Sequence, residues 1–222
     1  RSRTKTIMII GGPALTKYND RTLKDLTTAP ASVPSSPGAL VHIKTLTASS
    51  SSTLSFVHGS SDVVFDNTYP IYVFKFINTH PSANGNQFQF NMTTDGSNYD
   101  VTKTSTMFYS VHKEDDSNQG LSYGGSYDLA QSTNFQALTD STSNDDDGST
   151  SGELFIFSPS STTFVKHFMA TTNSLFSGGT YTWQEFTAGY GNTTSAVTGV
   201  QFKYSSGNID AGTIKLYGVK DA

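Results

Sequence analysis

The densest group of chemically capable side chains in this sequence is the Asn-Asp-Asp-Asp-Gly run at residues 144–148. Carboxylate and amide oxygens placed this closely are ligands that Ca²⁺ accepts. The run lacks the alternating Asp spacing and the terminal Glu of a calcium-binding loop, so a solvated turn is the default interpretation. A calcium site stays open as an alternative, and we predict no metal-ligating residues.

Catalysis needs groups that this sequence does not bring together. The Gly-Ser-Thr-Ser-Gly run at residues 148–152 has Thr where a nucleophile elbow has Ser. Glycoside hydrolysis needs two facing carboxylates, and apart from Glu153 and Glu185 the acids cluster in predicted loops. The histidines are too far apart in the chain for two of them to bind one metal ion from a single element. A polar position on a sheet face is a better explanation of each than a metal ligand or a catalytic base. We predict no catalytic residues, no cofactor and no enzyme activity. The histidines are His42, His58, His80, His112 and His167.

Aromatic side chains beside amides favour carbohydrate binding over catalysis. A sugar stacks its apolar face on an aromatic ring and bonds its hydroxyl groups to amides and carboxylates. Tyr181 and Trp183 share one face of a predicted strand, and Tyr190 and Asn192 follow just beyond it. These four residues are the candidate glycan contacts, although the only tryptophan of a β protein is more often part of its core.

Alternating side chains predict the strands that must position these groups. Between residues 69 and 92, aromatic and β-branched residues alternate with polar ones at period two, and turn-forming residues at 80–85 divide the stretch. No helical stripe of useful length occurs. The pattern predicts an all-β protein, an antiparallel two-sheet sandwich that is jelly-roll-like. Eleven strands are predicted, at residues 40–47, 53–57, 71–78, 87–93, 104–112, 134–138, 152–157, 162–171, 180–187, 197–204 and 213–219.

Composition restricts the partners and the core. Of 222 residues, 35% are hydrophobic and 14% charged, with Phe 15 and Tyr 11, so we expect a core built mainly from aromatic rings. The net charge of -4 offers no basic field, and nucleic acid is therefore not an expected partner. Cysteine is absent, which excludes disulfides and thiolate zinc sites. The apolar stretches are too short for membrane insertion, so we expect a soluble protein.

The first 39 residues differ from the rest of the chain. Basic residues precede a short apolar stretch, and the Pro- and Ser-rich segment at residues 29–38 is typical of an extended linker. We predict an N-terminal arm, residues 1–39, joined to a β-sandwich body, residues 40–222. An irregular segment wrapped on the domain is the alternative. The candidate anchoring residues of the arm are Arg1, Arg3, Lys5, Ile7 and Ile9.

Four segments of the body have distinctive amino-acid sequences: YPIYVFKFINTHP at residues 69–81, YDLAQST at 127–133, FSPSSTTFVKHF at 157–168 and SSGNIDAGTIKLYG at 205–218. Together they resemble a family of structural proteins of marine tailed bacteriophages, including phages of cyanobacteria and other ocean bacteria. The resemblance covers about residues 41–219. It implies a virion component and carries over no catalytic residues.

The resemblance implies a non-enzymatic structural protein on the exterior of the virion, as a head decoration or fibre or as a tail fibre or baseplate component. The arm would anchor the body to other virion proteins by strand addition or wrapping. We expect a homo-oligomer, with a trimer as one form, because such assemblies are symmetric. The alternative function is a receptor-binding module that recognises a host-surface glycan.

Overall fold

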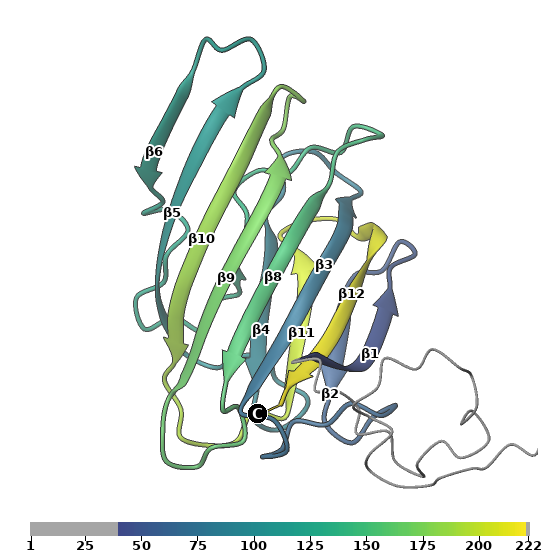
Figure 1. The fold of residues 1–222 in the computed structure, drawn as a ribbon, viewed down its shortest axis with the longest axis vertical. Coiled ribbons are helices and arrows are strands. Elements are labelled where there is room, and N and C mark those ends of the chain that lie inside the picture. The colour runs from purple at the N-terminus through teal and green to yellow at the C-terminus, as the bar shows by residue number, and fades with distance from the viewer. Residues whose placement is uncertain (1–39, 221–222) are drawn as a thin grey trace, which may run out of the picture. The chain divides into compact units, whose positions relative to one another are not determined.

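Twelve β-strands in two antiparallel sheets form the described part of the chain, residues 40–220 of a computed structural model (Figure 1). These residues contain no helix, and therefore none that could cross a membrane. The predicted all-β sandwich is confirmed. The predicted arm, with its candidate anchoring residues Arg1, Arg3, Lys5, Ile7 and Ile9, lies outside the described residues.

The strand boundaries agree with most of the sequence prediction. Eleven strands have a predicted counterpart, although β9 begins at Lys166 and not at residue 162. The strand β6 has none, because Gln119 and Gly120 follow Asn118 in a group of residues typical of a turn. The strands are β1 (Leu40–Thr47), β2 (Leu54–Val57), β3 (Ile71–Pro81), β4 (Phe88–Thr93), β5 (Lys103–Lys113), β6 (Gln119–Tyr123), β7 (Gln136–Ala137), β8 (Thr150–Phe157), β9 (Lys166–Leu175), β10 (Tyr181–Gly191), β11 (Gly199–Tyr204) and β12 (Ile209–Val219).

The strand order identifies the sandwich as a jelly roll. The larger sheet has the order β1-β12-β3-β8-β9-β10-β5-β6, and the smaller sheet has the order β2-β11-β4-β7. Along the chain, the first four strands of the larger sheet and the four strands of the smaller sheet change sheet at every step except one, because β4 and β7 follow each other within the smaller sheet. This is the arrangement of an eight-stranded jelly roll with two Greek keys.

Four further strands, β9, β10, β5 and β6, widen the larger sheet beyond the jelly roll, and we call them the extension. They arise from two insertions, one between β4 and β7 and one between β8 and β11. In Figure 1, β5 and β6 extend past the smaller sheet, whose strands β4, β11 and β2 lie behind the other part of the larger sheet. The inner face of the extension therefore needs a different cover.

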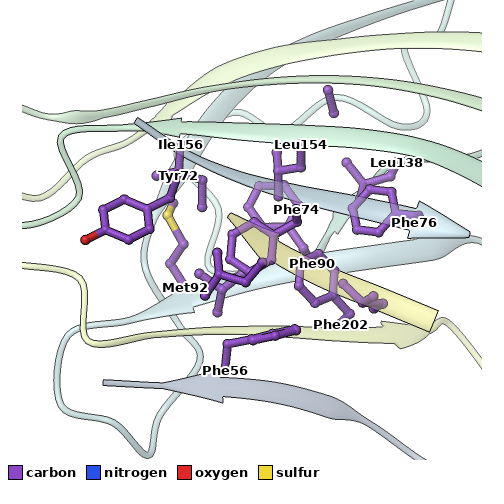
Figure 2. Close-up of a cluster of buried hydrophobic side chains, with 14 of the residues drawn as sticks. Phe56, Tyr72, Phe74, Phe76, Phe90, Met92, Leu138, Leu154, Ile156 and Phe202 are labelled. Carbon is purple, nitrogen blue, oxygen red and sulfur yellow. The ribbon is translucent and has the colours of Figure 1, made fainter. Parts of the chain in front are cut away.

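Aromatic rings fill the space between the two sheets, as composition predicts (Figure 2). Along β3, Tyr72, Phe74 and Phe76 point inward and are buried. The ring centroid of Phe202, from β11, lies 5.1 Å from that of Phe74 and 5.3 Å from that of Phe76. Both contacts are edge-to-face, which is a favoured arrangement of aromatic pairs. Each ring removes about 150–250 Å² from water, so this cluster is a main source of the stability of the fold.

Candidate binding cleft

A polar cleft of about 470 Å³ lies on the outer face of the smaller sheet. Its floor comes from strands β4 and β11, and its wall comes from the long segment that joins β6 to β7. A volume of this size is within the range of small-molecule sites. The lining residues are Gln87, Gln89, Tyr99, Ser126, Tyr127, Asp128, Leu129, Thr133, Asn134, Phe135, Ala137, Lys203 and Ser205.

Alternation along β4 and β11 places the polar floor opposite the aromatic core. Phe88, Phe90 and Phe202 are buried between the sheets, so the residues next to them point outward. Gln89 and Lys203 are direct cross-strand partners, which brings the amide and the ammonium side by side. Gln89 also donates from Nε2 to Oε1 of Gln87 at 3.0 Å.

An aromatic ring and a carboxylate stand in the wall of the cleft. The Nζ atom of Lys203 lies 4.3 Å from the ring centroid of Phe135, a cation–π contact between floor and wall. The hydroxyl of Tyr123, in β6, donates to Oδ2 of Asp128 at 2.5 Å. Asp128 is half-buried, so its orientation is held while it stays within reach of solvent.

A buried amide beneath the cleft ties two wall segments together. Asn91, in β4, donates from Nδ2 to the carbonyl oxygens of Tyr99 at 2.6 Å and of Thr133 at 2.9 Å. Its Oδ1 accepts from Nζ of Lys103 at 2.5 Å, and that Nζ also donates to the carbonyl oxygen of Val101 at 2.7 Å. Burial disfavours the charged form of Lys103 and lowers its pKa to about 7. These contacts hold the two segments that carry Tyr99 and Thr133 in fixed positions.

Tyr127 is fixed at both its backbone and its side chain. Gln136, which is buried in β7, donates from Nε2 to the carbonyl oxygen of Tyr127 at 2.8 Å and accepts from Oγ of Ser105 at 2.5 Å. The Tyr127 hydroxyl donates to a carboxylate oxygen of Asp140. Burial raises the pKa of both groups above their ordinary values. The wall of the cleft is thus preorganised by side chains that lie behind it.

The cleft combines the groups that polyhydroxylated ligands require. The amides of Gln87, Gln89 and Asn134 each supply donors and an acceptor, and the rings of Tyr99 and Phe135 offer apolar faces. Sugars present both an apolar face and a rim of hydroxyls, and such sites bind them by stacking and by hydrogen bonds. The arrangement is suited to recognising a carbohydrate.

The structure separates the four candidate glycan contacts into two places. Trp183 lies on the inner face of β10, stacked between Tyr109 and Phe176 with ring centroids 4.5 Å away on each side. Tyr181 packs on Phe176 from the same face of β10. Trp183 is therefore a packing residue of the extension, and its substitution would mix effects on folding with effects on binding.

Tyr190 points to the opposite, outer face of β10, since it lies an odd number of residues from Trp183. It lines a shallow, mainly apolar groove of about 510 Å³ with Phe157, His167 and Met169. Asn192 follows the end of β10 and donates from Nδ2 to Oε1 of Gln131 at 2.8 Å. Tyr190 and Asn192 are thus not brought together with the other two candidates.

The two glutamates outside the acidic loops lie on opposite faces of the larger sheet. Glu153 is the cross-strand partner of Thr171, which is the partner of Phe186, so Glu153 shares the outer face with Phe186. Glu185, next to Phe186, points inward and is fully buried. These carboxylates cannot flank one substrate as a glycosidase requires.

Residues 144–148 form a turn in which the three aspartates are exposed and Gly148 N donates to the carbonyl oxygen of Asp145 at 2.6 Å. Within residues 40–220, no three His, Asp or Glu side chains gather closely enough to hold a metal ion. His42, His112 and His167 are exposed members of β1, β5 and β9, as predicted. The other two histidines bond to backbone groups.

Comparisons of the chain with protein-family models, curated proteins and solved structures found no match. The resemblance to phage structural proteins therefore stays a prediction. Sequence reasoning missed the cleft because Gln89 and Lys203 look like ordinary outward-facing residues of two strands far apart in the chain. The sequence features that could have indicated the cleft are the outward-facing amides of β4 and the Tyr-Asp pair at residues 127–128.

Proposed function

We propose that this chain is a non-enzymatic structural protein on the exterior of a bacteriophage particle, anchored to other virion proteins through residues 1–39. The supporting observation is where three of the four phage-like segments lie. The segments at residues 69–81 and 205–218 contain β3 and β12, which pair with each other in the jelly roll. The segment at 127–133 lines the wall of the cleft. These phage-like segments thus form a central strand pair and part of the candidate binding surface.

Incorporation into particles tests this function. The full chain and a variant lacking residues 1–39 would be supplied during infection, and both would be quantified in purified particles by mass spectrometry. We expect the full chain in particles and a loss of at least about tenfold for the shortened chain, because the arm supplies the attachment. Full incorporation without the arm would contradict the anchoring. Absence of the full chain from particles would contradict the virion function itself.

The polar cleft favours a second function, recognition of a host-surface glycan by the same exposed body. The buried side chains of Asn91 and Gln136 hold the wall of the cleft before any ligand arrives, which lowers the entropic cost of binding. This function is compatible with either a head or a tail position, because it depends only on exposure of the cleft.

Binding of the full chain to host-surface polysaccharide, measured by calorimetry or on a glycan array, tests the second function. Gln89→Ala and Phe135→Ala should each weaken binding by about tenfold, the effect of losing one hydrogen bond or one stacking contact. Tyr190→Ala, in the groove on the larger sheet, is the matched control and should bind like the parent. If Tyr190→Ala abolishes binding while the two cleft variants bind normally, the site is the groove and not the cleft.

A further inference from the structure

The strand β6 forms one edge of the larger sheet and has an unusual surface. Among residues 40–220 it pairs with β5 alone, and all five of its residues are exposed. Leu121 is 70% exposed and Tyr123 is 60% exposed, among the highest values for large apolar side chains within residues 40–220. An edge strand leaves a row of backbone donors and acceptors open to another strand.

The hydrogen bonds to β5 identify which backbone groups of β6 point away from the sheet. Gly124 N donates to the carbonyl oxygen of Met107 at 2.8 Å, and Lys113 N donates to the carbonyl oxygen of Asn118 at 2.8 Å. Antiparallel pairing alternates between bonded and non-bonded positions, so residues 118, 120, 122 and 124 bond to β5. The N–H and C=O groups of Gln119, Leu121 and Tyr123 therefore point outward.

The two edges of the larger sheet differ in how they resist pairing. At the opposite edge, β1 carries Lys44 and has a register irregularity between His42 and Lys44. A charge and a bulge are common ways of blocking edge-to-edge contact. The β6 sequence, Gln-Gly-Leu-Ser-Tyr, has no charge and no proline, and its pairing with β5 is regular. Nothing within β6 itself opposes the addition of a strand.

We propose that β6 pairs antiparallel with β6 of a second copy of this chain, about a two-fold axis at Leu121. This register places Leu121 opposite Leu121 and Gln119 opposite Tyr123, and joins the outward groups in roughly six backbone hydrogen bonds. A second copy fits because the uncharged segment places no like charges opposite each other. The two larger sheets become continuous, and the outer-face side chains of Tyr123 and Phe108 from both copies share one surface.

The contact is small, so the pairing is weak between free chains and effective where copies are concentrated. An edge of five residues buries far less than about 1,200 Å², the lower limit of standard stable interfaces. We expect a dissociation constant on the order of 100 µM. Copies held side by side on a scaffold would pair more strongly, because their effective concentration is in the millimolar range.

Sedimentation of the full chain over a range of concentrations tests the pairing. The parent should form dimers, and Leu121→Lys should be monomeric because it places two ammonium groups at the axis. Phe164→Lys is the matched control, since Phe164 is also 70% exposed and gains the same charge, and it should dimerise like the parent. A parent that stays monomeric up to about 1 mM, a trimer without dimer, or an unchanged Leu121→Lys would overturn the proposal.

A cross-link locates the contact independently of the solution affinity. The chain has no cysteine, so a single Leu121→Cys variant has one thiol. Bonded antiparallel partners have Cα atoms about 5.5 Å apart, within the range of a disulfide. Mild oxidation should give a covalent dimer of Leu121→Cys several-fold faster than of Phe164→Cys. Equal rates for the two variants would exclude the axis at Leu121.

Discussion

The inner face of the larger sheet is covered in two different ways. In the jelly roll, β3 and its neighbours face the smaller sheet, and the space between them holds aromatic rings (Figure 2). In the extension, the cover is the segment at residues 124–149, which is irregular except for the two residues of β7 and bonds to β5, β9 and β10. This segment bonds to side chains on the inner face, for example from Leu129 N to Oγ of Ser105 at 2.9 Å.

The difference in cover explains the difference in side chains. The backbone groups of a sheet are satisfied by neighbouring strands, so a sheet can be covered with apolar side chains alone. An irregular segment brings unpaired backbone groups, and the surface below must bond to them. Accordingly, Thr172 Oγ1 donates to the carbonyl oxygen of Leu138 at 2.5 Å, and Asp140 N donates to Oε1 of Glu185 at 3.3 Å.

Because of this cover, the extension contains buried polar groups. Burial raises the pKa of Glu185 to about 8, despite hydrogen bonds from Asp140 N, Ser174 Oγ and Thr172 Oγ1. On the same face of β10, Trp183 Nε1 and Thr187 Oγ1 are buried without a hydrogen-bond partner among the described residues. Such groups cost free energy, so we expect the extension to be less stable locally than the jelly roll.

The largest expected effect lies in the aromatic core. Phe202→Ala removes the ring at the centre of the cluster and leaves a cavity, so it should lower the free energy of unfolding by about 3–5 kcal/mol. Phe186→Ala is the matched control on the outer face of the extension, where the ring is partly exposed and stacks on Phe108. Urea denaturation measures both. Equal losses would mean that the two regions are equally packed.

The second effect is a dependence of stability on pH that comes from the extension. The raised pKa means that the folded state holds the Glu185 proton more tightly than the unfolded state does. Stability from this group is therefore full below pH of about 4.5 and falls as pH rises to about 8, by at most about 1.4 kcal/mol per pH unit.

Glu185→Gln should remove this part of the slope. Glu153→Gln, the control on the opposite face, should leave it in place. Denaturation of the parent and the two variants at a series of pH values gives the comparison. A parent and a Glu185→Gln variant with parallel profiles would show that Glu185 does not titrate differently on folding.

A third, smaller effect should appear in the covering segment. Thr172→Val keeps the shape of the side chain but leaves the carbonyl oxygen of Leu138 without its donor, at a cost of about 1–2 kcal/mol. Hydrogen exchange should speed up in residues 138–140 and stay unchanged in β3. Uniform acceleration across both regions would indicate that they open as one unit and would contradict the comparison.

The smallest effect concerns the outer face, where water screens charges. Lys75 Nζ and Glu153 Oε2 are 2.7 Å apart, and both side chains are more than a third exposed. Glu153→Gln should change the free energy of unfolding by less than about 1 kcal/mol, and less still at high salt. A loss as large as that of Thr172→Val would show that the outer face contributes as much as the inner face.

The sequence predicts the jelly-roll half well and the extension less well. The alternation along β3 and β4 is a local pattern, so their strands and their buried faces can be read without a structure. The strand β6 offers only Leu121 and Tyr123 on one face, after Gln119 and Gly120, which are typical of a turn. Its strand conformation depends on pairing with β5, which no local pattern reports.

The cleft was beyond sequence reasoning for a related reason. Gln89 and Lys203 become neighbours only because β4 pairs with β11, and Phe135 reaches Lys203 only because the covering segment returns to the smaller sheet. The opposite error occurs at Trp183. Its type and spacing suit a glycan platform, but Tyr109 and Phe176 enclose it on the inner face.

By itself, the amino-acid order determined that this chain forms strands, which residues of each strand share a face, and that aromatic rings build the core. Those properties follow from a side-chain period of two, which involves only neighbouring residues. The tertiary structure alone decided which strands pair, where the polar cleft opens, and that Glu185 is buried beneath a loop. Each of these depends on contacts between residues distant in the chain, and a residue becomes buried only when those contacts form.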